Sequence, residues 1–375
     1  MPTGRNPRKL ARMSHETAPT RQPIVIWFGR VGDMILLSAL LDMLHRRYGR
    51  PCLLVGAGVF TEEIYRGHRD VAQVNCIRRY TPYLFDPAWW RALLALRRTR
   101  TNPVYVCETD PRKLARIRRL LTLSGTDPGR CLFITEEASC RAEHWVDRLV
   151  SFGRLTPPAL RDRDWQPGDS PGRNPMGQPL CAPRLDVSAA AKADCDAWVE
   201  AQGWSGRPLI LVQPGNRRTM RGKNLRVSAQ DDKAWPIERW AGLLRRVHER
   251  MPQAAIVLCG APRETLLLSW IHAAVNMPTV VYAAELPLGR LIALCAQAHS
   301  MISVDTGPAH AAAAVGLPLV DLFGGESQTR WLPRSSTGSP VIGIGGPPES
   351  TRLDQISEQR AFDAWLKLLE SRRAQ

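Results

Sequence analysis

The sequence lacks several features that would place it in a common class of protein. It contains no stretch of eighteen apolar residues, so we expect no transmembrane helix. The first segment, 1–22, is basic but has no apolar core of the kind that a secretory signal needs, and we interpret it as a disordered tail. Nine cysteines are spread widely without a Cys-x-x-Cys pair. This spacing argues against a disulfide framework or a zinc site and favours reduced thiols in the cytoplasm.

Acidic residues are also few. The chain has 35 Asp and Glu against 51 Lys and Arg, which gives a net charge of +16 and a pI near 10.0. Such a surface attracts nucleic acid, anionic lipid or phosphorylated substrates, although a solvated basic surface alone would look the same. A complete glycine-rich dinucleotide-binding motif is missing as well. Gly56-Ala57-Gly58 follows an apolar run but lacks the third glycine of the dinucleotide-binding fingerprint.

The chain does contain a regular alternation of short apolar runs with helical patterns. Its 375 residues, 44% of them hydrophobic, suggest about two domains. Buried strands that alternate with helices indicate parallel sheets covered on both faces, an α/β doubly wound fold. The predicted strands are 24–28, 52–55, 104–107, 131–134, 209–212, 255–259, 279–282, 301–304 and 319–323. The predicted helices are 34–47, one near Thr61, 113–121, 188–202, 237–249, 263–274, 288–296, 308–315 and 362–369.

A proline-rich segment divides this alternation in two. Seven prolines lie between Leu155 and Pro183, where few residues are apolar. We therefore predict an N-terminal Rossmann-like domain over 23–154, a linker over 155–187 and a C-terminal domain over 188–350. A last helix within 351–375 is expected to pack back on the N-terminal domain. Ligands of such folds bind outside the carboxyl ends of the strands, which places the site in the cleft between the domains.

The turn IWFGRVGDMILLS, 26–38, carries one carboxylate where a strand meets a helix. Asp33 at this junction could take a proton from a substrate, or could simply cap the helix by accepting from its first N–H groups. A second turn, Asp305-Thr306-Gly307, follows a strand and opens a helix at Pro308. Exposed N–H groups at such a helix start form a site for a phosphate, and His310 lies one turn further on. Here too capping by Asp305 or Thr306 is an alternative.

Two further stretches follow strand ends in the second half. Glu264, in GAPRE directly after a strand, is well placed to accept hydrogen bonds from ribose hydroxyls, but it could equally complement a helix dipole. A long basic loop, 216–233, follows Gln213-Pro214-Gly215. Most of its charges are typical of a solvated loop, and Lys233 is the one that we predict to meet a phosphate.

Four segments, taken in order, resemble glycosyltransferase family 9, the heptosyltransferases: GRVGDMILLSALLDMLHRRYG, QPG…DDKAWPIERWAGLL, GAPRE and SVDTGPAHAAAAVGLPLVDLFG. The resemblance extends from about Ile24 to Arg334. It implies the GT-B fold, two Rossmann-like domains facing across a cleft, with the donor bound by the C-terminal half and the acceptor by the N-terminal half. It also implies inverting, metal-independent transfer of heptose from ADP-heptose to the lipopolysaccharide inner core.

The resemblance gives each candidate residue a role. Asp33 matches the catalytic acid and would be the general base, and Gly29 and Gly32 would let the acceptor approach it. The donor-binding residues that match the family are Lys233, Glu264, Asp305, Thr306, Gly307 and His310. No metal or other cofactor is implied beyond the nucleotide sugar. The expected partners are a glycan or glycolipid acceptor and the anionic inner face of a bacterial inner membrane, without nucleic acid.

Two other functions remain open at this point. The doubly wound pattern alone would also suit an NAD(P)-dependent oxidoreductase, and the charge would suit a non-catalytic protein that binds anionic lipid or nucleic acid. The sequence does not determine the sugar, the nucleotide base, the acceptor or the oligomeric state.

Overall fold

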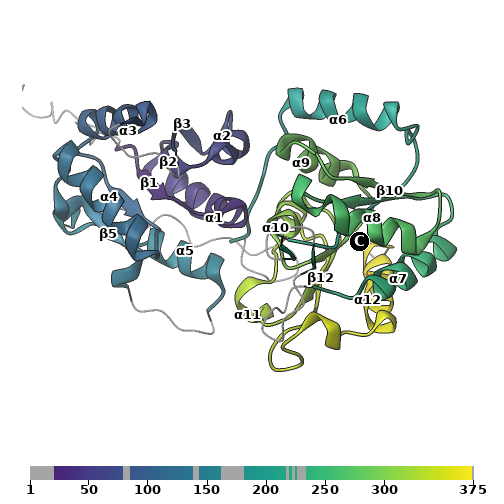
Figure 1. Cartoon of the computed structure of the whole chain (residues 1–375). Helices are drawn as coiled ribbons and strands as arrows, with labels where there is room; N and C mark the ends of the chain where they lie inside the picture. The colour runs from purple at the N-terminus through teal and green to yellow at the C-terminus, as the bar shows by residue number, and fades with distance from the viewer. Residues whose placement is uncertain are drawn as a thin grey trace, which may run out of the picture.

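Two separate parallel sheets organise the chain (Figure 1). The computed structural model describes residues 21–78, 85–137, 143–161, 181–216, 219–221, 224–225 and 234–373. Residues 1–20 of the predicted N-terminal tail and Lys233 lie outside these residues, as do most of the proline-rich linker and of the basic loop. Within that loop, the short strands β7 (Met220–Arg221) and β8 (Asn224–Leu225) pair in an antiparallel hairpin.

The N-terminal sheet has the order β3-β2-β1-β4-β5, with all strands parallel. Its strands are β1 (Ile24–Trp27), β2 (Cys52–Ala57), β3 (Val71–Ile77), β4 (Val104–Val106) and β5 (Cys131–Phe133). Along β1, Val25 and Trp27 face one core and Ile24 and Ile26 face the other, as expected for a strand buried on both faces. The first core lies beneath α1 (Val31–Tyr48), α2 (Val59–Tyr65) and α5 (Trp145–Gly153), and the second beneath α3 (Pro87–Arg98) and α4 (Pro111–Ser124).

The C-terminal sheet is built in the same way, with the order β10-β9-β6-β11-β12-β13. Its strands are β6 (Leu209–Gln213), β9 (Ala255–Cys259), β10 (Val280–Ala283), β11 (Ser300–Val304), β12 (Leu319–Phe323) and β13 (Val341–Gly345). One face is covered by α6 (Ala189–Ala201), α9 (Leu288–Gln297) and α10 (Gly307–Ala314), and the other by α7 (Ile237–Arg250), α8 (Thr265–Val275) and α12 (Glu358–Arg373). The strand order reverses beside β1 in the first sheet and beside β6 in the second, and ligands of doubly wound folds bind at such points.

The C-terminal helix differs from the prediction. α12 packs against α7, β12 and β13 of the C-terminal domain, so its predicted packing on the N-terminal domain is wrong. Trp365 is fully buried there, and its indole N–H donates to the Ser300 hydroxyl at 3.1 Å. The apolar stripe of this helix completes the core of the sheet nearest to it in sequence.

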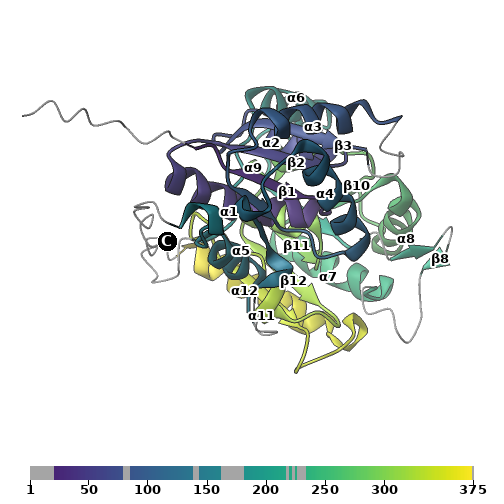
Figure 2. The ribbon, with the colours of Figure 1, turned by 90° about the vertical axis from the view of Figure 1, so that its left-hand side faces the viewer.

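The two domains meet through the helices that cover the facing sides of the sheets (Figures 1 and 2). α1 packs against α10, and Ala311 and Ala314 of α10 belong to the same core as α1. α2 similarly contacts α9. Among the residues that the structure describes, no helix is long and apolar enough to cross a bilayer.

Candidate functional site

The turn between β1 and α1 lines the cleft through residues 30–32 and is followed directly by Asp33. Asp33 is the third residue of α1, and its Oδ2 accepts a hydrogen bond from the Arg30 N–H, the residue that precedes the helix, at 2.6 Å. This is one half of a capping box, so the capping alternative describes part of what Asp33 does. The side chain is half-buried. A capping bond to one oxygen is compatible with proton transfer at the same carboxylate.

Glycine is required on one side of this turn, for a reason that the sequence did not reveal. A Cβ on Gly29 would stand 2.6 Å from the Cβ of Asp33, so the space beside Gly29 is taken up by the Asp33 side chain. A Cβ on Gly32 would stand 3.5 Å from the Cα of Gly307 and from Cδ2 of His310, both in the other domain, which is an ordinary contact. The approach of an acceptor at these two glycines stays a prediction.

The second predicted turn lies directly opposite. Thr306 caps α10, because its Oγ1 accepts from the Ala309 N–H at 3.3 Å, and the capping alternative holds for this residue. Gly307 begins the helix, and a Cβ there would stand 3.2 Å from the backbone nitrogen of Gly32. The start of α1 and the start of α10 therefore meet at two glycines. The predicted juxtaposition of the two turns is present in the structure.

A third group of residues lies at the ends of β6 and β9. Glu264 is 3% exposed, and its Oε2 accepts from the Ala261 N–H at 2.7 Å. Its Oε1 makes no hydrogen bond to the described residues, although the Gln213 side chain lies beside it and donates to the Gly215 carbonyl at 2.8 Å. Burial raises the pKa of the Glu264 carboxyl, and the hydrogen bond from the Ala261 N–H offsets part of this rise. A buried acceptor without a partner is suited to a hydroxyl donor from a ligand.

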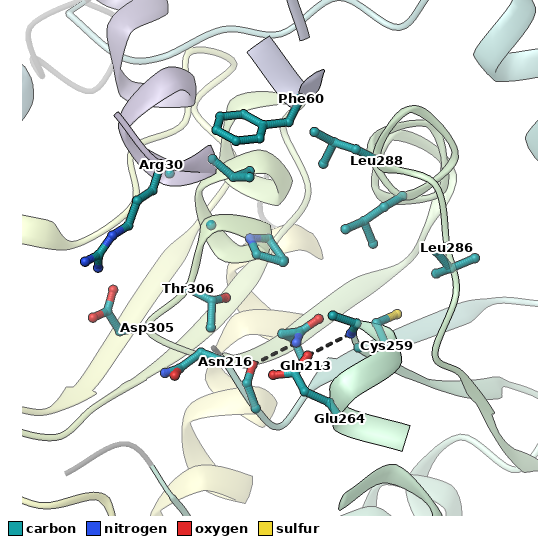
Figure 3. Close-up of a pocket in the computed structure, with 18 of the residues that line it drawn as sticks. Arg30, Phe60, Gln213, Asn216, Cys259, Glu264, Leu286, Leu288, Asp305 and Thr306 are labelled. Carbon is teal, nitrogen blue, oxygen red and sulfur yellow. Dashed lines mark hydrogen bonds between the residues drawn. The ribbon is translucent and has the colours of Figure 1, made fainter. Parts of the chain in front are cut away.

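A cavity of about 810 Å³ joins these groups (Figure 3). Its wall includes five of the predicted site residues: Gly32, Glu264, Asp305, Thr306 and Gly307. Asp33 and His310 lie behind this wall, next to Gly32. Lys233 falls outside the described residues, so its role stays a prediction.

Arg30 and Phe60 are among the wall residues that the sequence analysis missed. Arg30 precedes α1, and Figure 3 shows its guanidinium extending across the cavity towards Asp305. Phe60 of α2 closes the cavity from the N-terminal domain, opposite Leu288 of α9. Arg30 could have been found, since it belongs to the same short turn as Asp33, but nothing near Phe60 in the sequence marks it.

The charge of the described wall is mixed. Arg30 and Arg263 stand against three acids, Glu264, Asp305 and Glu326. The cation that the sequence predicts for this site, Lys233, lies outside the described residues, so the wall described here shows only part of the charge around the cavity. No group of three or more His, Cys, Asp or Glu side chains within the described ranges is arranged to hold a metal ion.

A second contact joins the domains at the edge of the cleft, around the start of α5. Asp147 of α5 forms a bidentate ion pair with Arg334 at 2.6 and 2.7 Å. Trp145 stacks on Trp331 of α11 (Gln328–Trp331), with ring centroids 5.7 Å apart. His144 caps α5 by accepting from the Val146 N–H at Nδ1, and its Nε2 is 2.9 Å from the Leu332 carbonyl. Because a carbonyl only accepts, Nε2 carries the proton and the ring is neutral.

We expect this contact to weaken in acid. Burial, assisted by Arg334, lowers the pKa of His144 to about 4. In the unfolded chain this histidine has a pKa of about 6.5, so as the pH falls it is protonated in the unfolded state before it is protonated in the folded state. The free energy of unfolding therefore decreases as the pH drops from about 6.5 to about 4. The His144→Asn variant keeps a helix cap but has no group that titrates in this range. Between pH 7 and pH 5, the decrease in its free energy of unfolding should therefore be about 1–2 kcal/mol smaller than that of the unchanged protein. Denaturant unfolding at both pH values measures the difference, and equal losses would contradict the assignment.

The fold and the site together define a two-domain α/β protein, in which two Rossmann-like units enclose a cavity at their strand ends. The sequence of residues 179–351 matches the model of glycosyltransferase family 9 (heptosyltransferase). The predicted resemblance to this family is therefore confirmed.

Individual relatives agree with this family. The chain is 28% identical to lipopolysaccharide heptosyltransferase 3 of Escherichia coli over 134 residues, 35% of each chain. It is 28% identical to the lipopolysaccharide core heptosyltransferase OpsX of Haemophilus influenzae over 32% of this chain and 35% of the relative. The aligned region thus spans about a third of the curated relatives.

Solved structures extend the likeness to the whole fold. The structure of E. coli ADP-heptose lipopolysaccharide heptosyltransferase II superposes with a TM-score of 0.70 and 20% identity, covering 94% of this chain and 99% of that one. E. coli heptosyltransferase WaaC with ADP superposes with a TM-score of 0.60 and 16% identity over 93% and 99%. The GT-B fold predicted from the sequence is therefore confirmed.

Proposed function

We propose that this chain is an inverting glycosyltransferase that moves a sugar, heptose from ADP-heptose, to a lipopolysaccharide-core or related glycan acceptor. The observation that carries the proposal is the meeting of the Gly32 and Gly307 turns beside one cavity of about 810 Å³. The matches to heptosyltransferases favour this function over an oxidoreductase or a non-catalytic basic protein.

In this proposal Asp33 is the general base. A sugar hydroxyl is a weak nucleophile until its proton is removed as the new bond forms, and a positioned base contributes about 10²–10⁴-fold. Asp33 lies one residue from Gly32, which lines the cavity, and its capping bond to the Arg30 N–H fixes the orientation of the carboxylate beside the cavity wall. A single displacement needs this one base and no enzymatic nucleophile, and it inverts the anomeric centre.

The leaving nucleoside diphosphate develops negative charge as the sugar departs. We assign its stabilisation to the start of α10 at Gly307, where backbone N–H groups and the helix dipole favour an anion. Arg30 would add a positive charge from the opposite domain, and Lys233 is proposed to add another. Glu264 would hold the ribose through its unpaired Oε1, with Gly215 leaving room beside it, since a Cβ there would stand 3.0 Å from that oxygen.

Nucleotide binding and transfer test the proposal. Titration calorimetry should detect ADP binding, and ADP-heptose with a heptose-free lipopolysaccharide core should yield a heptosylated product and ADP. Glu264→Gln should weaken ADP binding by about 10-fold or more, because a hydrogen bond to a charged acceptor is worth roughly 1.5–3 kcal/mol. Glu249→Gln, at an exposed acid of α7, is the matched control. Tighter binding of UDP or GDP than of ADP would assign a different nucleotide to the donor sugar. Failure to bind any nucleotide sugar, or to transfer a sugar from it, would reject the proposed function.

A further inference from the structure

Phe28 lies between the end of β1 and the turn that carries Asp33, and side chains hold its backbone on both sides. The pairing of β1 with β4 extends to Ile26. Two residues further on, the Phe28 N–H donates to Glu108 Oε2 at 3.2 Å, and the Phe28 carbonyl accepts from Lys113 Nζ at 2.9 Å. Both partners come from the junction of β4 and α4, so this junction replaces strand pairing at the entrance to the turn.

The Glu108 carboxylate is held on all sides. It is 2% exposed, and its Oε1 accepts from the Thr109 N–H at 3.1 Å and from the Asp110 N–H at 3.0 Å. Its Oε2, which receives the Phe28 N–H, also lies 3.6 Å from Lys113 Nζ. A buried carboxylate is costly unless donors and an opposite charge surround it. These contacts therefore favour a single orientation of the Glu108 side chain.

Lys113 is fixed at its backbone as well as at its side chain. Its N–H donates to Oδ1 of Asp110, the residue that caps α4, at 3.1 Å. Its side chain is 36% exposed, and the ammonium group lies between the Glu108 carboxylate and the Phe28 carbonyl. An ammonium group has three donors, so it can serve both partners and still be hydrated. We call these two side chains the Glu108–Lys113 clamp.

The clamp holds the peptide group that leads directly to Asp33. Lys113 bonds to the carbonyl of the peptide between Phe28 and Gly29, and Gly29 packs so closely against the Asp33 side chain that a Cβ would clash with it. The next residue, Arg30, donates its N–H to Asp33 Oδ2 at 2.6 Å. The position of the carboxylate is thus set by backbone groups one and two residues beyond the clamp.

We propose that Glu108 and Lys113 are positioning residues, which hold the Asp33 carboxylate in the orientation that proton removal requires. Neither of them belongs to the described wall of the cavity, so they act through the turn and not by contact with a substrate. A displacement of about 1 Å between reacting groups costs about a hundredfold in rate. Loss of the clamp lets the turn shift by part of that distance. The inference rests on the proposed function, because it takes Asp33 as the general base.

Substitutions of the two clamp residues, tested singly and together, measure their contribution. Lys113→Met should lower kcat about tenfold, while the KM for the acceptor and the affinity for ADP change by less than about twofold. Glu108→Gln should have a similar effect, because an amide nitrogen in place of one oxygen cannot accept an N–H. The double variant should be no slower than the slower single variant, since both side chains act through the same peptide. Lys113→Arg should restore kcat to within about threefold of the unchanged protein, because a guanidinium can also donate to both partners.

The Asp33→Asn variant separates a positioning role from a purely structural one. Because the clamp acts through the Asp33 carboxylate, adding Lys113→Met to Asp33→Asn should not lower the residual turnover further. Multiplied losses would overturn the proposal. So would a raised KM for the acceptor at unchanged kcat, which would make Lys113 a binding residue. The matched control is Arg118→Met, at another cation of α4 that pairs with exposed Glu136 at 2.7 Å, and it should leave kcat unchanged.

Hydrogen exchange tests the clamp without any turnover. In Lys113→Met the amides of residues 27–34 should exchange about tenfold faster than in the unchanged protein, because the turn opens more often. The amides of β9, in the other domain, should not change, and Arg118→Met should leave all of these rates unaltered. Faster exchange in a chain that transfers no sugar would support the clamp and reject the proposed function alone. Unchanged exchange with unchanged kcat would reject the clamp and leave the proposed function standing.

Discussion

Asp33→Asn should lower kcat for sugar transfer by about a thousandfold while ADP still binds within about threefold of the normal affinity. The amide oxygen of asparagine can continue to accept from the Arg30 N–H, a bond of 2.6 Å in the native turn, so α1 should still begin at the same residue. The amide cannot take the acceptor proton. Steady-state kinetics with ADP-heptose, together with calorimetry for ADP, separate the two effects.

Asp42→Asn is the control for this experiment. Asp42 lies on the same helix and pairs with Arg46 at 2.7 Å, away from the cavity. An exposed ion pair of this kind contributes about 0–1 kcal/mol, so turnover should be unchanged. Undiminished turnover by Asp33→Asn would remove this residue from the chemical step and leave its capping bond as its whole role.

Gly307→Val should lower kcat/KM for sugar transfer roughly a hundredfold. A Cβ at this position already stands 3.2 Å from the backbone nitrogen of Gly32 and from Cγ1 of Val31. The two extra methyl groups of valine must push the start of α10 away from the Asp33 turn, and a displacement of about 1 Å between reacting groups is enough for such a loss. Gly307→Ala, with one carbon in the same place, should fall between valine and glycine.

Gly289→Ala supplies the matched control, because the nearest atom to its Cβ is Ala191 Cβ at 3.6 Å, an ordinary contact. Its activity should equal that of the unchanged protein. Circular dichroism of all three variants checks that the fold is retained. Full activity of Gly307→Val would show that the two turns need not touch during transfer.

The buried parallel strands were the most predictable part of the fold. The run 255–259 is continuously apolar because both faces of the strand are covered, and 319–323 is apolar except for Asp321; the structure has strands with these bounds. β3 was missed because its sequence, VAQVNCI, mixes polar and apolar residues at the edge of the sheet. α3 and α5 were missed as well. Their exposed or domain-contacting aromatic residues obscure the amphipathic pattern.

The candidate site was predictable in its chemistry but not in its geometry. Glu264 and Thr306 were found because each follows a strand end, where a doubly wound sheet gathers its ligand-binding groups. The contact between Gly32 and Gly307 joins residues 275 positions apart in the sequence and depends on how two domains pack, which no local pattern encodes. The packing of α12 was mispredicted for the same reason. An amphipathic stripe shows that a helix must be covered, but not by which sheet.

The packing of α1 against α10 has a consequence for motion. The helix that bears Asp33, the proposed general base, also packs on α10 of the C-terminal domain. A rotation of the domains about this contact would separate the more distant Phe60 and Leu288 further than it would separate Asp33 from α10. The proposed base would therefore keep its place while the cavity opens to admit a substrate.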